Sequence, residues 1–590
     1  MSPPPAHAIP AIAAAAALAV APFVMPAGVV TLLGYIGLYA IVCLGLVLLT
    51  GLVGITSFGQ AAFVGLAAYV SALAVTQLGW SPWVSLPAAI GVTGAFGWAL
   101  GWLTIRLSGH YLVLGTMAWG LGLYYLFGNL QGLGGFNGIA GVPKLRLGGF
   151  SVSDPRVFHL LVWSIVGLLL LGSYRLIDSR AGRAIRSLRD PVMVESFGVE
   201  SARLKLQVFV AAALSAGLAG WLHAHYIGHV NPGPFGINAS VDYLFMAVIG
   251  GTGSPAGAVL GPAVVETLRT VVRDAVPALS GVGGNFEAIL FGGLVVVLLQ
   301  RASGGLAPLL GRFLPAAPPP RAPERAEPLP RRELPAPGST LLEVRAVTRR
   351  FGGLVAVDHV DFEVAAAEIV GLIGPNGAGK STLFNLVTGV LETSGGEVRV
   401  GGRRVDGLPP RAIAALGVAR TFQHVRLRPA MTCLENVALG AWLRGRAGFL
   451  AGALGLAREE EARCLHEAQR QLDRVGLGGL AAAPAGSLSL GQQRILEIAR
   501  ALAADPALLM LDEPAAGLRL QEKQALAELL RALRGQGVTV LVVEHDMDFV
   551  MNLVDRLVVL QFGQKIAEGT PDAVRRDPRV IEAYLGGLDD

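Results

Sequence analysis

The sequence contains little charge and little cysteine. Charged residues make up 15% of the 590 residues and hydrophobic residues 53%, whereas soluble domains carry about 25% charge. The three cysteines, Cys43, Cys433 and Cys464, lack metal-ligand spacing, so no metal cluster and no disulfide framework is expected. The N-terminus also lacks the basic region of a signal peptide, and we expect it to begin a first membrane span.

The scarcity of charge is confined to one part of the chain. Charges are sparse and clustered up to Gly305, whereas the sequence from Leu341 onward has ordinary soluble composition. This contrast predicts a membrane domain over residues 1–305 and a soluble domain over 341–590. The proline-rich segment 306–340 has no apolar periodicity and is typical of an extended, semi-rigid linker, with a docking ligand for a partner domain as the alternative.

Long apolar segments follow one another in the first domain. A helix needs about 20 apolar residues to cross a bilayer, and glycine and proline are tolerated in such helices. The candidate spans are Ala8–Met25, Val29–Thr50, Leu52–Leu78, Trp83–Ile105, Tyr111–Leu130, Val157–Ile177, Leu206–Gly228, Val241–Gly261 and Phe286–Gln300. Their number and their lack of polar faces exclude a large buried soluble core.

Basic residues gather in one loop of this domain and predict its orientation. They are Arg175, Arg180, Arg183, Arg186, Arg189, Arg203 and Lys205. Such a loop is expected on the cytoplasmic side, and we interpret the arginines as a topology signal alone. The chain must then return to the cytoplasm, so either "IGGTGSPAG" interrupts a re-entrant pair of half-helices, which we favour, or Val264–Ser280 crosses the membrane.

The soluble domain contains a phosphate-binding loop between a predicted strand and a predicted helix. The segment from Gly374 to Ser381 reads GPNGAGKS and fits the pattern G-x-x-x-x-G-K-[ST]. Glycines let backbone N–H groups surround a phosphate, and the helix N-terminus favours negative charge. Lys380 is expected to reach the outer phosphates and Ser381 to hold Mg²⁺. The remaining loop candidates are Asn376, Gly377, Gly379 and Thr382.

A second apolar run, "ALLMLDEP", ends in two acidic residues. Asp512 is expected to hold Mg²⁺ through water, and Glu513 is the candidate general base for the attacking water. A third run, "TVLVVEH", also ends in polar residues. Apolar strands separated by helical stretches favour a parallel α/β sheet. The predicted fold class is therefore a polytopic all-α membrane domain followed by an α/β P-loop ATPase domain.

Further motifs resemble those of ATP-binding cassette (ABC) ATPases. Leu488–Gln492 (LSLGQ) resembles the signature motif, and the resemblance assigns nucleotide contacts to Ser489, Gly491 and Gln492. Gln423 in "RTFQ" resembles the Q-loop, His545 in "VVEHD" the switch histidine, and Phe351 the aromatic residue that stacks on adenine. The resemblance implies that Gln423 senses the γ-phosphate and contributes to the Mg²⁺ site.

The resemblance narrows to branched-chain amino acid importers. "FGGLVAV", "RTFQHVRL", "LSLGQQRILEIARAL" and "GTPDAVRRDPRVIEAYLG" are similar to LivG-type ATPases, whereas "SFGQAAFVGLAAYVSAL", "GGFNGIAGVP" and "GGTGSPAGAVLGP" are similar to LivM-type permeases. The chain thus resembles two subunits fused. It departs from most cassettes at Leu490, where a glycine is usual, at Gly517, which is acidic in many cassettes, and in "GLRLQE".

The resemblance implies a mechanism and partners. Two ATPase domains clamp two ATP molecules head to tail, so a LivF-like second ATPase and a LivH-like second permease are expected, or a second copy of this chain, together with an external solute-binding protein. "LRDPVMVESFGVE" resembles the permease coupling segment, with Glu195 and Gly198 at matching positions. The expected location is the bacterial inner membrane, in contact with lipid, with the ATPase in the cytoplasm.

The expected function is ATP-driven import of branched-chain amino acids, with ATP and Mg²⁺ as cofactors. Related importers that carry urea, amides or other amino acids are the alternative, and an ABC exporter is a second one. An ATPase acting on nucleic acid behind a membrane anchor is disfavoured, because the spans are too many and no basic groove is evident. Asp242 and Glu266 lie near predicted span ends, so no intramembrane charge is expected to select the substrate.

Overall fold

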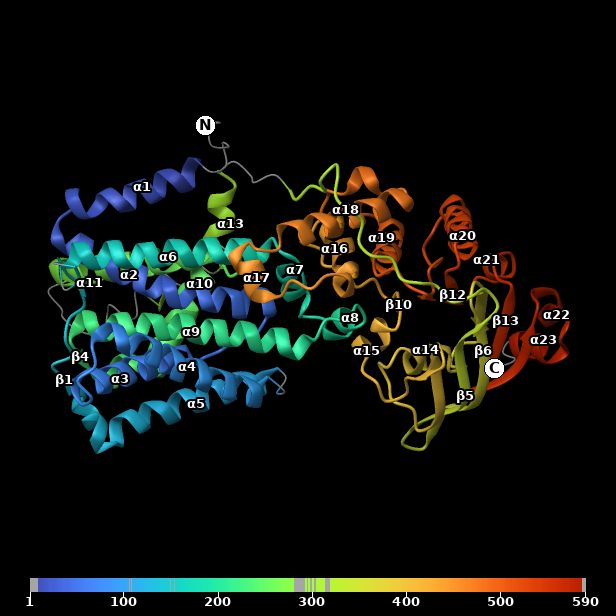
Figure 1. Cartoon of the computed structure of the whole chain (residues 1–590), viewed down its shortest axis with the longest axis horizontal. Helices are drawn as coiled ribbons and strands as arrows, with labels where there is room; N and C mark the ends of the chain where they lie inside the picture. Colours follow the sequence, from blue (N-terminus) through green and yellow to red (C-terminus); the bar gives the residue numbers. More distant parts are fainter. Residues whose placement is uncertain are drawn as a thin grey trace. The chain divides into compact units, whose positions relative to one another are not determined.

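The chain folds into two compact units, which a computed structural model describes. The described residues are 9–105, 107, 109–148, 150–152, 154–280, 292–293, 296–297, 300–301, 304–313 and 319–585. Unit 1 comprises Met1–Ile177, Ala202–Pro318 and Ala453–Gly455; unit 2 comprises Asp178–Ser201, Pro319–Gly452 and Leu456–Asp590 (Figure 1). The basic loop between two apolar helices therefore belongs to the same unit as the ATPase.

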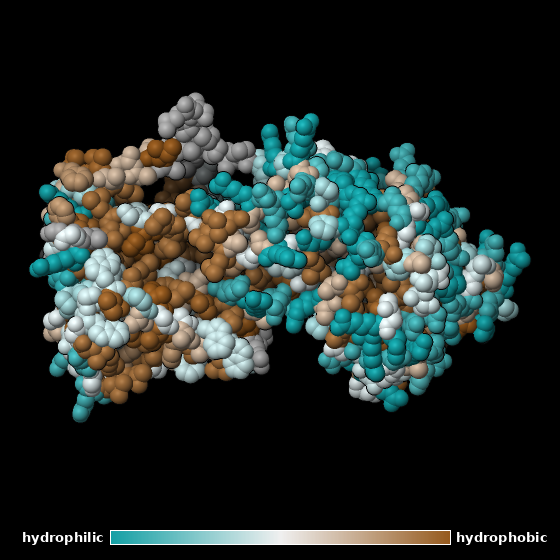
Figure 2. All heavy atoms as spheres, viewed as in Figure 1, coloured by the Kyte–Doolittle hydropathy of each residue, from teal (hydrophilic) through white to brown (hydrophobic). Residues whose placement is uncertain are grey.

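Unit 1 is built of apolar helices. They are α1 (Ile9–Val24), α2 (Ala27–Leu46), which continues as a π-helix (Val47–Val53), α3 (Gln60–Thr76), α4 (Pro82–Thr104), α5 (His110–Asn129), α6 (Pro155–Ile177), α9 (Ser201–Ile227), α10 (Ile237–Gly250), α11 (Gly257–Ser280) and α13 (Leu306–Gly311). The visible surface of this unit is largely hydrophobic (Figure 2). Such a surface suits lipid rather than water.

Five helices of the described residues are long and apolar enough to cross a membrane, namely Ala27–Val53, Pro82–Thr104, His110–Asn129, Pro155–Ile177 and Ser201–Ile227. The expected span Leu52–Leu78 is shorter in the structure, because the helix begins only at Gln60. The glycine at position 54 adopts φ +83° and ends the preceding π-helix. The expected span Phe286–Gln300 lies largely outside the described residues.

The predicted span Val241–Gly261 is wrong, because the chain turns between α10 and α11. Helix α10 has 14 residues and α11 has 24, so only the first is half-length. At about 1.5 Å per residue, α11 is long enough to cross a bilayer. The predicted interruption at "IGGTGSPAG" is therefore present, but the second helix is longer than a half-helix. Glycines make the turn possible: a Cβ on Gly250 would lie 1.8 Å from the carbonyl oxygen of Gly257.

Unit 2 contains the predicted parallel sheet and a second, antiparallel one. The six-stranded sheet has the order β10 (Val418–Arg420), β11 (Leu508–Asp512), β12 (Thr539–Val543), β7 (Ile369–Ile373), β13 (Arg556–Gln561), β14 (Gln564–Gly569), and only β14 is antiparallel. The four-stranded sheet has the order β6 (Leu354–Ala365), β5 (Thr340–Phe351), β8 (Gly395–Val400), β9 (Arg403–Arg404). Strands β7, β11 and β12 are buried along their length, as expected for a parallel sheet covered on both faces.

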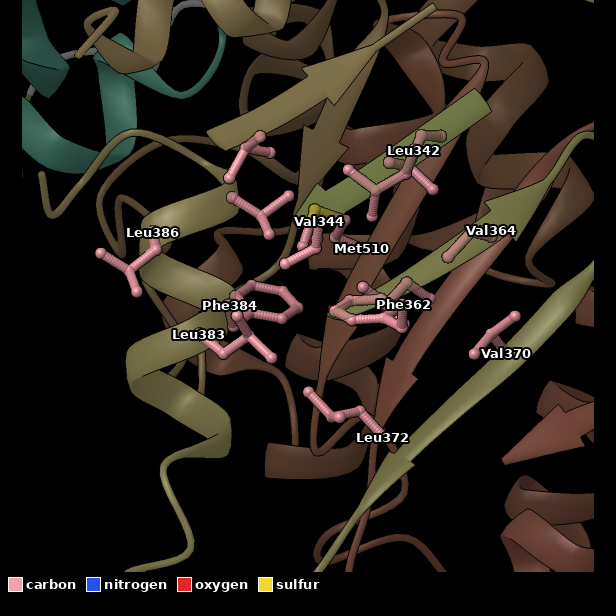
Figure 3. Packing of buried hydrophobic residues seen from close by; sticks show 14 of the residues in the cluster. Leu342, Val344, Phe362, Val364, Val370, Leu372, Leu383, Phe384, Leu386 and Met510 are labelled. Atoms are coloured by element: carbon pink, nitrogen blue, oxygen red, sulfur yellow. The ribbon is translucent and has the colours of Figure 1, made fainter. Parts of the chain in front are cut away.

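The helices of unit 2 cover the sheets and form a helical subdomain. They are α7 (Arg180–Ser187), α8 (Pro191–Glu195), α14 (Lys380–Val387), α15 (Pro410–Ala415), α16 (Cys433–Gly440), α17 (Phe449–Leu454), α18 (Arg458–Arg474), α19 (Leu490–Ala503), α20 (Leu520–Gly535), α21 (Met547–Met551), α22 (Pro571–Arg576) and α23 (Pro578–Leu585). One core cluster packs α14 against both sheets, with Phe384 and Phe362 facing each other (Figure 3). This packing fixes the helix that follows the phosphate-binding loop.

The proline-rich segment packs against unit 2 from Pro319 onward. Leu329 is 4% exposed and lies in the core cluster of α16, α18 and α19. The Arg444 guanidinium donates to the carbonyl oxygens of Leu329 and Pro330 at 3.2 and 3.1 Å, and the backbone N–H of Arg332 donates to Asp505. We call residues 319–337 the strap. The strap is extended and largely exposed, as expected for a linker, but Leu329 and several backbone groups anchor it to unit 2.

Candidate functional site: a nucleotide site and a bound membrane-domain loop

The phosphate-binding loop connects β7 to α14. Gly374 and Gly379 adopt φ of +150° and +96°, and a Cβ on them would lie 2.1 Å from the carbonyl oxygen of Leu560 and 2.4 Å from that of Ala356. Glycine is therefore required at both positions. Lys380 is 5% exposed, and its ammonium donates to the carbonyl oxygens of Gly374 and Pro375 at 2.7 and 2.9 Å. Burial lowers its pKa, against the charges of Glu513 and Asp512.

The remaining candidate residues of the loop are accessible to a ligand. Asn376 and Gly377 are exposed, whereas Ser381 and Thr382 are half-buried in the first turn of α14. The backbone N–H groups of that turn have no partner within the helix and carry its positive dipole end. The loop therefore offers the donors and the charge that a polyphosphate needs.

Asp512 ends strand β11 and is 4% exposed. Burial raises its pKa to about 6. Its Oδ1 is buried without a hydrogen-bond partner among the described residues. A buried carboxylate oxygen of this kind suits a cation or its bound water, so the residues present fit the Mg²⁺ site that the sequence predicts.

Three predicted residues meet around one carboxylate. Glu513 Oε1 lies 3.1 Å from the amide nitrogen of Gln423 and 3.0 Å from Nε2 of His545. The three come from the ends of β10, β11 and β12, which are adjacent parallel strands. Because the carboxyl ends of parallel strands share one edge of a sheet, residues far apart in sequence converge there.

Glu513 is held in a strained backbone conformation. Its φ is +50°, which costs a non-glycine residue about 1–3 kcal/mol. Its N–H donates to the carbonyl oxygen of Val543 at 2.9 Å, and its carbonyl oxygen accepts from Arg494 at 3.1 Å. Arg494 also donates to the carbonyl oxygen of Gln423 at 3.2 Å. Arg494, which no sequence motif marks, thus holds the backbones of two of the three converging residues.

Glu544 is a second residue that the motifs did not reveal. It is 2% exposed, and its carboxylate accepts from the backbone N–H of Ala515 at 2.7 Å and from that of His545 at 3.1 Å. Burial raises its pKa, and these hydrogen bonds oppose the shift. Glu544 therefore ties the segment after β11 to the segment after β12.

The signature residues lie at the start of α19, on the surface of unit 2. Ser489 is exposed and caps the helix: its Oγ accepts from the N–H of Gln492 at 3.3 Å, and the Gln492 side chain accepts from the N–H of Ser489 at 3.1 Å. Gly491 lies against Glu522 and Leu518. Gly517 has φ +78°, which explains why glycine suits this position. These residues do not join the cluster at the sheet edge.

Phe351 is the last residue of β5 and is 42% exposed. The guanidinium of Arg349 lies 4.6 Å from its ring centroid. An exposed ring on a rigid strand is accessible to a planar base.

The basic loop is bound to the helical subdomain through ion pairs. Both terminal guanidinium nitrogens of Arg183 donate to the Glu461 carboxylate, and Nη2 lies 3.0 Å from Oε2. Arg186 pairs with Glu435 at 2.6 Å. Arg180 lies 3.8 Å from the ring centroid of Trp442 and donates to backbone carbonyl oxygens nearby. The interpretation of these arginines as a topology signal alone is therefore wrong.

Apolar side chains of the same loop are buried within unit 2. Met193, Val194, Phe197 and Val199 are at most 1% exposed. Gly198 has φ +85°, and a Cβ there would lie 2.4 Å from the side chain of Leu443. The predicted coupling residue Glu195 instead accepts from the hydroxyl of Ser201 within the loop itself.

Contacts continue from the Gln423 segment to this loop. The Arg426 guanidinium pairs with Asp190 at 2.9 Å, and its backbone N–H donates to Glu497 at 2.8 Å. Arg500 is fully buried, pairs with Glu497 at 2.9 Å and lies 4.9 Å from the ring centroid of Phe197. One buried ion pair thus supports both the segment after Gln423 and the loop.

Comparisons with known families cover both halves of the chain. Residues 28–299 match the family described as branched-chain amino acid transport system / permease component. Residues 357–516 match the ABC transporter family, and residues 564–590 match the family described as branched-chain amino acid ATP-binding cassette transporter.

Curated relatives match the ATPase half. The high-affinity branched-chain amino acid transport ATP-binding protein BraF of Pseudomonas aeruginosa is 46% identical over 42% of this chain and 98% of its own length. LivG of Escherichia coli (strain K12), which has the same description, is 45% identical over the same shares. A crystal structure of a nucleotide-free ATP-binding cassette from an ABC transporter is 33% identical over 42% of this chain and 99% of that chain, with a TM-score of 0.38.

The matches agree with the sheet edge at which Gln423, Glu513 and His545 converge and with the apolar helices of unit 1. The chain belongs to the branched-chain amino acid ABC transporter family and joins a permease domain and a nucleotide-binding ATPase domain of that family in one polypeptide.

Proposed function

We propose that the chain is one permease half and one ATPase of an importer that uses ATP to move branched-chain amino acids across the bacterial inner membrane. The observation that carries this proposal is the fusion itself, a branched-chain amino acid permease match and an ATPase related to BraF and LivG in one chain. The basic loop belongs to the same unit as the ATPase. Because basic loops of membrane proteins lie in the cytoplasm, the ATPase is expected there too.

The converging residues suit ATP hydrolysis. Lys380 and the loop amides bind the phosphates, and Glu513 orients the attacking water and accepts its proton. His545 and Gln423 hold the Glu513 carboxylate and lie where they can also contact the γ-phosphate. Ser381, Asp512 and Gln423 would hold Mg²⁺, and its charge would offset that of the phosphates. Phe351 stacks on the adenine.

The signature residues require a second ATPase domain. Ser489, Gly491 and Gln492 lie at a helix N-terminus whose cap, Ser489, is exposed, so the positive dipole end can face a γ-phosphate bound by another domain. That domain belongs to a separate subunit or to a second copy of this chain. A second permease subunit and an external solute-binding protein complete the proposed importer.

The bound loop provides the coupling. Closure of two ATPase domains moves the Gln423 segment, and Arg426 and the buried pair of Glu497 and Arg500 transmit that movement to the loop as a rigid-body shift. Gly198 allows the close approach to Leu443, and Glu195 keeps the loop attached to the start of α9.

The test is uptake of labelled leucine in cells that carry the native chain and its partner subunits. Glu513→Gln should abolish uptake and lower ATP hydrolysis by about 100-fold or more, while ATP binding remains. Glu528→Gln, an exposed site on α20, is the matched control and should transport at the native rate. Equal uptake in native and Glu513→Gln cells would refute leucine import and point to urea, amides or export.

A further inference from the structure

Unit 1 contains a cavity with apolar walls and a charged pair. Its volume is about 140 Å³, and it lies among α2, α3, α9, α10 and α11. The apolar lining includes Leu38, Val42, Val64 and Met246, and the rings of Phe235, Tyr39, Tyr243 and His223 add aromatic walls that carry polar groups.

Two oppositely charged side chains line the same cavity. Asp242 of α10 and Arg269 of α11 face it and form an ion pair at 3.1 Å. Arg269 also pairs with Glu266 at 3.1 Å, one helical turn away. Asp242 and Arg269 are 37% and 33% exposed, whereas Glu266 is 12% exposed. The charges expected near the ends of the spans therefore include a pair that lines a cavity.

The arrangement of these charges fits one class of solute. An α-amino acid carries an ammonium and a carboxylate on the same carbon, so its two charges lie side by side, as those of Asp242 and Arg269 do. A zwitterion can insert between the paired side chains and replace one ion pair with two, which keeps every charge compensated in an apolar surrounding. A neutral solute offers no such exchange. Glu266 holds Arg269 in place when Asp242 moves to the ligand.

We propose that this cavity binds the transported aliphatic amino acid within the permease domain, with its ammonium on Asp242, its carboxylate on Arg269 and its side chain against Leu38, Val42 and Met246. The inference deepens the proposed function and rests on it. It adds a site at which the permease itself distinguishes zwitterions from neutral amides, independently of any solute-binding protein.

The first test is equilibrium binding of labelled leucine to the purified full chain in detergent, without a solute-binding protein. Leucine should bind saturably. Leucinamide, which lacks the carboxylate, and 4-methylpentanoate, which lacks the ammonium, should compete only at concentrations at least tenfold above that of unlabelled leucine. Competition by either compound as effective as that of leucine, or no saturable binding, would overturn the proposal.

The second test uses variants in the leucine uptake assay. Asp242→Asn and Arg269→Gln should each lower uptake at least tenfold, whereas Arg156→Gln, at an exposed arginine of α6, should match the native chain. The exchange Asp242→Arg/Arg269→Asp keeps an ion pair but reverses the ligand's two anchors, so uptake should stay low. Restored uptake in the exchange variant would show a structural pair and refute the proposal.

The two tests separate this inference from the proposed function. If native cells take up leucine and Glu513→Gln cells do not, leucine import stands whatever the cavity variants do. If native cells take up no leucine, the proposed function fails, and binding to the purified chain then still reports whether the cavity prefers a zwitterion.

Discussion

Replacing Glu461 with alanine should release the basic loop from the helical subdomain. Glu461 makes a two-pronged ion pair with Arg183, and its Oε2 also accepts from the backbone N–H of Arg180 at 2.9 Å, at the start of α7. The Arg183 side chain is only 2% exposed, so its charge has little access to water once the carboxylate is gone.

The burial of Arg183 determines how much free energy the loop should lose in Glu461→Ala. Removing one partner of a buried ion pair costs about 3–5 kcal/mol, because the other charge stays buried without compensation. Glu461 is 17% exposed, which allows some water to reach the gap, so we expect about 3 kcal/mol. The pKa of Arg183 agrees in direction: burial lowers it, but the charge and hydrogen bonds of Glu461 raise it above its ordinary value overall.

Hydrogen exchange of the full chain in lipid nanodiscs measures this change. The amides of α7, such as Arg183, whose N–H donates to Ser179 at 3.0 Å, should lose about 100-fold of their protection in Glu461→Ala. Glu459→Ala, at an exposed position two residues earlier on α18, is the control and should keep native protection. Protection in Glu461→Ala within about threefold of native, or an equal loss in Glu459→Ala, would refute the reasoning.

Three further predictions concern the nucleotide site. Gly374→Ala should destabilise unit 2, because its Cβ would lie 2.1 Å from a backbone oxygen of Leu560, and thermal unfolding should show a lower midpoint than that of Gly377→Ala, where the space is open. Lys380→Ala should weaken ATP binding by about 10- to 100-fold, the value of a charged hydrogen bond, as measured by titration with a fluorescent ATP analogue. The raised pKa of Asp512, about 6 against an ordinary value near 4, means that its ionised form opposes folding. Without nucleotide and Mg²⁺, Asp512→Asn should therefore be more stable than the native chain by about 3 kcal/mol above pH 6, and the difference should shrink to nothing as the pH falls to about 4, as denaturant titrations at several pH values would show.

Much of the nucleotide site could be predicted from the sequence because each motif is local. The loop from Gly374 to Ser381, the acidic pair after β11 and the histidine after β12 each follow an apolar strand, and a parallel sheet brings such ends together. The convergence of Gln423, Glu513 and His545 confirms that geometry. Arg494 could not be predicted, since it acts through two backbone carbonyl oxygens whose positions depend on the tertiary fold.

The membrane half was harder to predict because composition does not locate helix ends. Apolar sequence continues through Gly54 and through Gly250–Gly257, where close backbone contacts of glycines end or turn the helices. The pairing of Asp242 with Arg269 depends on the approach of two helices separated by that turn. The arginines of the basic loop likewise indicate membrane topology from their number alone. The ion pair of Arg183 with Glu461 could not be predicted, because the two residues lie about 280 positions apart in the chain.

The strap has a consequence for where the ATPase begins as a folding unit. Composition places the start of the soluble domain near Leu341, yet Leu329 is as buried as a core residue and Arg444 uses strap carbonyl oxygens as its acceptors. A truncated chain starting at Leu341 would expose the apolar side chains that contact Leu329 and leave the Arg444 guanidinium with fewer acceptors. Losing the burial of Leu329 alone should lower the free energy of unfolding by about 1.5–3 kcal/mol. In folding terms, the strap is therefore an N-terminal arm of the ATPase.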